Sequence, residues 1–159
     1  NLLDRFRLGG RITEDPGRVL QTTIRKCIEM VRILLLGGHP KGFAEPFSPE
    51  TLSGKRLRGL VDGLHFQYVH FDDLWFDKLS EDGGRITSQM EAFLKCMAQD
   101  GFVIVALGKR VQHALKNHTK LAFIALPHPA ARRRIDLNEL KKGLKELSGV
   151  RRAYKEIVA

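Results

Sequence analysis

Apolar and polar residues follow two different spacings along this chain. Short, nearly continuous apolar runs predict four strands, at residues 31–36, 66–71, 102–107 and 121–126. Around them, apolar residues recur every three or four positions, as on one face of a helix. Strands that alternate with helices are typical of a parallel sheet covered on both faces. The first, third and fourth runs carry so few polar residues that we expect both of their faces to be buried.

Five segments with the helical spacing are predicted to be helices, at residues 15–28, 52–64, 86–97, 108–116 and 136–147. Asp15-Pro16 supplies a cap and a first-turn proline to the first, and Asp136 is the expected cap of the last. Residues 78–85, rich in Asp, Gly and Ser, are predicted to be a loop. The basic tail around residues 151–155 alternates with apolar residues, which favours a surface helix over a nucleic-acid arm. We therefore expect one α/β domain over residues 1–159, with three α/β/α layers around a four-stranded parallel sheet.

The charge balance points to a polyanionic partner. The chain has 159 residues, with 27 Lys and Arg against 18 Asp and Glu, a net charge of +9 and a pI near 9.9. Such a surface attracts DNA before any specific contact forms, although a basic solvated surface alone has the same composition.

The cysteines and the hydropathy indicate the expected cellular compartment. Cys27 and Cys96 each fall inside an apolar helical pattern, so we expect small buried hydrophobic residues in a reducing compartment, with neither a disulfide nor a metal site. The longest apolar run is too short to span a membrane, and no basic region followed by an apolar stretch opens the chain. A cytoplasmic monomer with no membrane partner is the expectation.

Two loop motifs carry the candidate chemistry. Gly37-Gly38-His39-Pro40-Lys41-Gly42 follows the first predicted strand, and Pro127-His128-Pro129-Ala130 follows the fourth. Loops at the carboxyl ends of parallel strands lie at the same edge of a sheet, where α/β folds bind ligands. Because Pro46-Phe47, with the aromatic ring of Phe47, lies shortly after the first motif, we expect a pocket for a nucleobase there.

Taken in order, these segments resemble the uracil-DNA glycosylase superfamily. A strand ending in Gly-x-x-Pro precedes Pro46-Phe47 and Ser53-Gly54, then Val105-Ala106-Leu107-Gly108-Lys109 follows, and His128-Pro129 resembles the family's His-Pro-Ser motif. The resemblance covers roughly residues 31–134 and rests on order and spacing. It implies a uracil-DNA glycosylase-like fold and an enzyme that flips a nucleotide out of DNA, cleaves its N-glycosidic bond and leaves an abasic site, without a cofactor.

The resemblance gives two residues their expected roles. Phe47 matches the aromatic that stacks on the flipped base, an interaction of about 1–3 kcal/mol that offsets part of the cost of flipping. His128 matches the hydrogen-bond donor to the base oxygen, which stabilises the negative charge on the departing base. The alternatives are a core aromatic at Phe47 and, at His128, a cap of the following turn.

Three positions depart from the family pattern. His39 stands where the family has a water-activating Asp or Asn. Three alternatives follow: His39 is the base, it donates a hydrogen bond to a phosphate, or catalysis has been lost. Ala130 replaces the motif's serine, and the arginine run that follows offers a substitute phosphate contact. At the end of the second strand Asp72 or Asp73 takes the place of an asparagine. Because an ionised carboxylate only accepts hydrogen bonds, it favours a base with an amino group, such as cytosine or a modified cytosine.

The predicted contacts with DNA surround this pocket. Gly38 and Lys41 offer backbone amides to an anion, and Gly38 belongs to the expected base-binding set with Phe47, Asp72 and Asp73. The predicted DNA-binding residues are Lys41, Ser53, Lys55, Lys109, Arg132, Arg133 and Arg134.

Two other classes remain beside the glycosylase. One is a DNA-binding module of the same fold without activity, and the other is a magnesium-dependent nuclease built on Asp72, Asp73 and Asp77. The histidine spacing does not suit zinc, and Ser53-Gly54-Lys55 lacks the preceding glycine of a phosphate loop.

Overall fold

The structure, a computed structural model, describes the backbone of residues 31–158 and the side chains of residues 31–148. The helix expected at residues 15–28 and the burial expected for Cys27 lie outside the described residues. In the described part, no helix is long and apolar enough to cross a membrane.

Four parallel strands form the centre of the fold. They are β1 (Arg32–Gly37), β2 (Tyr68–Asp73), β3 (Phe102–Leu107) and β4 (Ile124–Leu126), in the order β2-β1-β3-β4. This confirms the prediction of an α/β fold with a four-stranded parallel sheet. The chain adds β2 on one side of β1 and β3 on the other, so the strand order reverses beside β1. In open α/β sheets, ligands bind outside the carboxyl ends of the strands at such a reversal.

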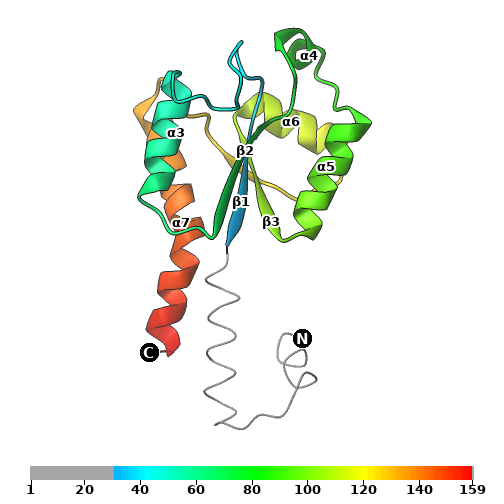
Figure 1. Ribbon diagram of the computed structural model, residues 1–159. Coiled ribbons are helices and arrows are strands. Elements are labelled where there is room, and N and C mark those ends of the chain that lie inside the picture. The colour runs from blue at the N-terminus through cyan, green and yellow to red at the C-terminus, as the bar shows by residue number, and fades with distance from the viewer. Residues whose placement is uncertain (1–30, 159) are drawn as a thin grey trace, which may run out of the picture.

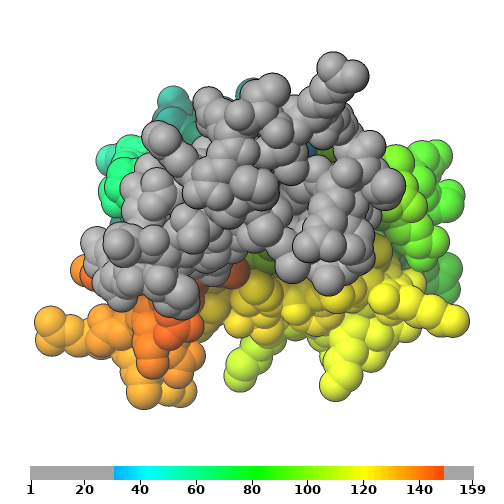
Figure 2. Space-filling model, turned by 90° about the horizontal axis from the view of Figure 1, so that it is seen from below, coloured from blue at the N-terminus to red at the C-terminus, as the bar shows by residue number. Residues whose placement is uncertain are grey.

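Helices cover both faces of the sheet. In Figure 1, α3 (Leu52–Asp62) and α7 (Arg134–Val158) lie on one side of it, and α5 (Ser88–Gln99) and α6 (Lys109–His118) lie on the other. A separate apolar core fills each space, because alternate residues of β1 and β3 point to opposite faces. Figure 2, seen from the end opposite the carboxyl ends of the strands, shows the start of α7 (orange) beside the segment of α6 and β4 (yellow).

The prediction of a loop at residues 78–85 is wrong, because the helix α4 (Lys78–Gly83) occupies most of this segment. Asp77 caps this helix by accepting a hydrogen bond from the Ser80 amide at 2.8 Å, and Gly84 ends it in the left-handed conformation with φ 69°. The small and polar residues that suggested a loop are therefore the caps of a short helix.

Four smaller expectations also need correction. β2 and β4 begin later than predicted, and β4 is an edge strand whose Ala125 is exposed, so it is not buried on both faces. Cys96 is exposed, because α5 turns Leu94 to the core and Cys96, two positions on, to solvent. α7 begins at Arg134, so Asp136 lies in its first turn and is not its cap. The predicted helix at the basic tail is present, since α7 continues to Val158.

Candidate functional site

The loops that follow β1 and β4 meet at the carboxyl edge of the sheet. The ring centroids of Phe47 and His128 lie 6.2 Å apart, with the rings inclined by 38°. Together with Asp73, at the end of β2, they line one small cavity. The cavity wall also contains five other residues from the predicted set or its motif, namely Gly38, His39, Pro40, Lys41 and Ser53. Residues separated by up to 90 positions are thus brought to a single point.

Phe47 is both a core residue and a wall of this cavity. It is 8% exposed, belongs to the core on the α3 side and packs on Phe71 at 6.2 Å. Its φ of 47° places a side chain in the left-handed region, which costs of order 1–3 kcal/mol. Arg58 of α3 holds that conformation, since its guanidinium donates to the carbonyls of Phe47 at 2.8 Å and Pro46 at 3.1 Å. The same guanidinium lies 4.4 Å from the Phe71 ring centroid.

Two glycines allow the aromatic ring and α3 to come this close. A Cβ on Gly37 would lie 2.5 Å from the Phe47 ring and 2.9 Å from Asp73 Oδ1. A Cβ on Gly54 would lie 1.9 Å from the carbonyl oxygen of Ser48. Gly37 at the end of β1 and Gly54 in the first turn of α3 therefore allow the Phe47 segment to lie between the sheet and the helix.

His128 is fixed in one tautomer. Its Nδ1 accepts a hydrogen bond from the Ala130 amide at 3.0 Å, so in the neutral ring Nε2 carries the proton. Burial, with the Lys41 ammonium as a second cause, lowers the pKa of His128 to about 4. The turn cap and the hydrogen-bond donor are thus compatible readings, because capping through Nδ1 makes Nε2 a neutral donor. Arg56 braces this loop by donating to the Pro129 carbonyl at 3.2 Å.

The two aspartates at the end of β2 have different surroundings. Asp72 Oδ1 accepts a hydrogen bond from the Asp73 amide at 2.8 Å, and its other oxygen lies 3.5 Å from His70 Nε2. Asp73 is 9% exposed, and its Oδ2 is buried without a hydrogen-bond partner among the described residues. Burial, followed by the nearby Asp72 charge, raises the pKa of Asp73 to about 6. Asp73 therefore has the unused hydrogen-bonding capacity in the cavity, and Asp72 serves mainly the local backbone.

His39 lies where three cavities meet. It borders the small one, of about 20 Å³, and two larger ones, of about 870 Å³ toward α4 and about 250 Å³ toward the start of α6. Its Nδ1 is hydrogen-bonded to the carboxylate of Glu81 on α4. The small cavity has room for about one water molecule, so a nucleobase enters only when a wall moves. Among the residues that line it, Lys41 is the exposed one, and it begins the exposed segment 41–45.

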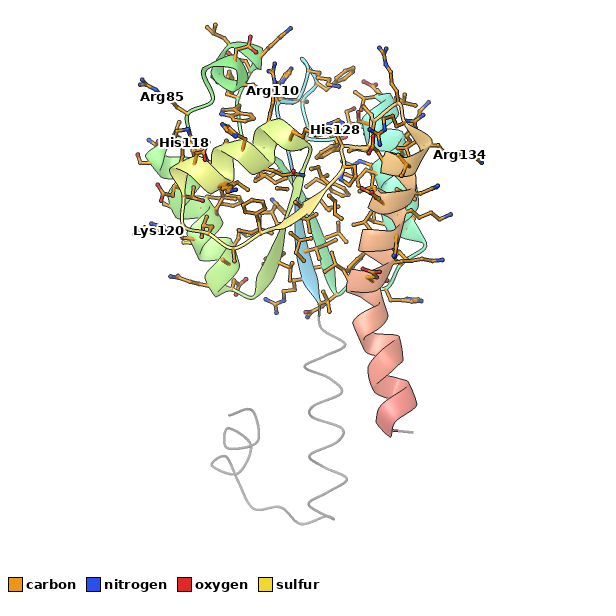
Figure 3. All side chains as sticks on the ribbon, turned by 180° about the vertical axis from the view of Figure 1, so that it is seen from behind. Arg85, Arg110, His118, Lys120, His128 and Arg134 are labelled. Atoms are coloured by element: carbon orange, nitrogen blue, oxygen red, sulfur yellow. The ribbon has the colours of Figure 1, made fainter. Side chains whose placement is uncertain are left out.

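The predicted DNA-binding cations are spread around this edge. Lys41, Lys55, Lys109 and the three arginines at 132–134 are all exposed. Arg133 pairs with Asp136 at 3.5 Å, and Figure 3 shows Arg134 extending into solvent from the start of α7. Ser53 is instead buried in the first turn of α3 and lines the small cavity. The roles given to these residues stay predictions.

Sequence reasoning missed three residues of the site: Glu81, Arg56 and Arg58. Glu81 gave no signal because its segment was assigned to a loop, whereas a test for helix caps at Asp77 and Gly84 would have exposed it. Arg56 and Arg58 lie two and four positions after Gly54, and their basic character suggested no contact with backbone carbonyls.

No part of residues 31–148 brings together three His, Cys, Asp or Glu side chains in a way that would hold a metal ion. Asp77, one of three acids in the nuclease alternative, is used as a helix cap. A scan against protein-family models and searches among curated proteins and solved structures found no match to this chain.

Proposed function

We propose that this protein is a DNA glycosylase of the uracil-DNA glycosylase type, which flips a pyrimidine nucleotide and hydrolyses its N-glycosidic bond. The observation that carries the proposal is the tautomer of His128. A neutral imidazole whose Nε2 carries the proton stands beside an aromatic ring and the Asp73 carboxyl group, whose Oδ2 has no partner among the described residues, at the edge of the sheet where α/β folds bind ligands.

The geometry suits stabilisation of a departing base. As the C1′–N bond breaks, the electron pair stays on the base, and a donor at a carbonyl oxygen of that base stabilises the charge. Because the pKa of His128 is about 4, the ring is neutral at physiological pH and adds no positive charge beside the developing sugar cation. Stacking on Phe47 holds the base in plane and contributes about 1–3 kcal/mol.

Asp73 is the residue placed to read the pyrimidine edge. With a pKa of about 6, raised first by burial and then shifted by Asp72, His39, Glu81 and Lys41, it is mostly ionised at pH 8 and mostly protonated at pH 5. The ionised carboxylate only accepts and suits the amino group of cytosine or a modified cytosine. The protonated acid both donates and accepts, as an amide does, and suits uracil. We therefore propose a pyrimidine preference that changes with pH.

One observation favours the second candidate, a DNA-binding module without activity. The space between Phe47 and His128, about 20 Å³, does not admit a base until part of its wall, such as Lys41, moves. A flipping enzyme needs that motion, and a binding module does not.

The test is incubation with end-labelled oligonucleotides, single- and double-stranded, that carry uracil, cytosine or a modified cytosine at one position. Cleavage that appears only after alkali reports an abasic site and supports the proposal. Retardation without abasic sites identifies the binding module, and direct strand breaks that need magnesium identify a nuclease.

A matched pair of histidine variants ties the activity to the site. His128→Asn retains an acceptor for the Ala130 amide but loses the Nε2 donor, and we expect its kcat to fall about 10²–10³-fold. His118, exposed at the end of α6, is the control, and His118→Asn keeps full activity. Equal activity of both variants would remove His128 from the mechanism.

A further inference from the structure

Glu81 places a carboxylate against His39 from an element that sequence reasoning had treated as a loop. The His39 and Glu81 side chains are 18% and 15% exposed, and His39 Nδ1 is hydrogen-bonded to Glu81. Because an ionised carboxylate only accepts, His39 Nδ1 carries the proton and the lone pair of the neutral ring is on Nε2. No other hydrogen bond to the His39 ring is formed among the described residues.

The surroundings of Glu81 hold it in this position. Helix α4 is capped at both ends, by Asp77 and Gly84, which fixes the turn that presents Glu81. A Cβ on Gly38 would lie 3.0 Å from Glu81 Oε1, so the glycine before His39 leaves space for the carboxylate. Across the 250 Å³ cavity, Arg110 of α6 approaches Glu81 at 3.8 Å and pairs with Asp82 at 3.0 Å. Figure 3 shows Arg110 between α6 and α4.

We propose that Glu81 is a positioning residue that turns His39 into the base for the attacking water, an inference that rests on the proposed glycosylase function. Glu81 fixes the proton on His39 Nδ1, which leaves the Nε2 lone pair to accept a proton, and His39 lines all three cavities. When the C1′–N bond breaks with its electron pair on the base, the water oxygen bonds to C1′. One water proton passes to His39 Nε2, and the base anion takes a proton from solvent.

The charge of the pair removes the main objection to a histidine at this position. A lone imidazolium would repel the positive charge that develops on the sugar. His39 and Glu81 together carry −1 before the proton transfer and 0 after it, so the pair never presents net positive charge to the sugar. A neutral histidine with its carboxylate thus combines a proton acceptor for the water with a net negative charge beside the sugar.

The first test observes the tautomer directly. Nitrogen-15 and proton NMR of the wild-type protein distinguishes the two neutral histidine tautomers, and signals absent from His39→Asn identify His39. We expect Nδ1–H in the wild type and a shift toward Nε2–H in Glu81→Gln, because a glutamine amide also donates. Nε2–H in the wild type, or no change in Glu81→Gln, overturns the inference.

The second test measures single-turnover rates of base excision. We expect Glu81→Gln to lower the rate of the chemical step by roughly 10–10³-fold with little change in DNA affinity. The matched control is Asp82→Asn, which removes a neighbouring carboxylate that also pairs with Arg110 but does not contact His39. The control retains the wild-type rate, and an equal loss in both variants would reveal a merely structural role for this helix.

The third test is a double-mutant cycle, which shows whether Glu81 acts through His39. If Glu81 acts through His39, Glu81→Gln costs little in a His39→Asn background, so the two losses do not add. Additive losses overturn the inference. A wild-type protein that makes no abasic sites refutes the proposed function instead, while a wild-type protein that is active and insensitive to Glu81→Gln refutes only this inference.

Discussion

Replacing Asp73 with asparagine should stabilise the protein at neutral pH and change its base preference. Asp73 is buried, and its Oδ2 has no partner among the described residues, so ionising it in the folded state is costly. Asparagine has almost the same shape and carries no charge. The substitution therefore removes the electrostatic cost and leaves the packing nearly unchanged.

The size of the effect follows from the pKa of Asp73. Its rise from 3.8 to about 6 means that the folded protein binds a proton that the unfolded chain releases between these two values. Stability is then lost as the pH rises from about 4 to about 6 and is constant above that. At about 1.4 kcal/mol for each pKa unit, the ionised carboxylate costs roughly 3 kcal/mol at pH 7.5 and roughly 1 kcal/mol at pH 4.5.

Urea denaturation at the two pH values measures this cost. The gain in unfolding free energy of Asp73→Asn over the wild type should be about 2 kcal/mol larger at pH 7.5 than at pH 4.5. Asp62→Asn is the control, since Asp62 is exposed at the end of α3 and its substitution should show no such difference. A gain for Asp73→Asn that does not depend on pH would refute the assignment of the raised pKa. In excision assays the same variant should prefer uracil at pH 5 and pH 8 alike.

Three further predictions concern the ring, the imidazole and the cations. Phe47→Leu keeps an apolar side chain in the core but loses stacking, so kcat/KM should fall about 10-fold or more while the unfolding free energy changes by roughly 1 kcal/mol; Phe47→Ala is the poorer test because truncating so buried a ring costs about 3–5 kcal/mol. NMR titration of His128 should give a neutral ring at every pH above about 5, and a midpoint near 6.5 would contradict its buried environment. Changing Arg132, Arg133 and Arg134 to serine should weaken binding to all DNA sequences and reduce the slope of log K against log salt by up to about 3, whereas Lys120→Ser, an exposed change before β4, should reduce it by 1 or less.

The sheet was predictable because its strands are buried. Ile33 to Leu36 of β1 and Ile104 to Leu107 of β3 are almost fully inaccessible, and burial on both faces leaves an apolar run that cannot be mistaken for a loop. The bounds of the edge strand β4 were less predictable, because that strand is only partly buried. Ala125 of β4 is exposed, so a run that looks continuous in sequence pairs over only three residues.

The loops that form the candidate site could be predicted from the sequence, but the residues and charges that support them could not. The order of the strands and the two motifs sufficed to bring Phe47 and His128 together, because both follow strand ends. Glu81 could not be found in this way, since its role depends on a six-residue helix whose caps resemble loop residues. Nor could the charge state of Asp73, which is set by burial and by Asp72 and not by the residue type.

Helix α3 is the common support of both halves of the candidate site. Arg58 donates to the backbone beside Phe47, and Arg56, two residues earlier, donates to the loop that carries His128. Leu57, between them, is fully buried against the sheet. Loss of this packing would release both loops at once, so the 6.2 Å separation of the ring and the imidazole is a property of α3 as much as of the loops themselves. Because neither arginine lines the small cavity, variants at these positions should alter the geometry of the site without altering its chemical groups. Arg58 also pairs with Glu45 at 3.6 Å, so the motion that admits a base is expected at Lys41 and the exposed residues 42–44, and not in the Phe47 or His128 loops.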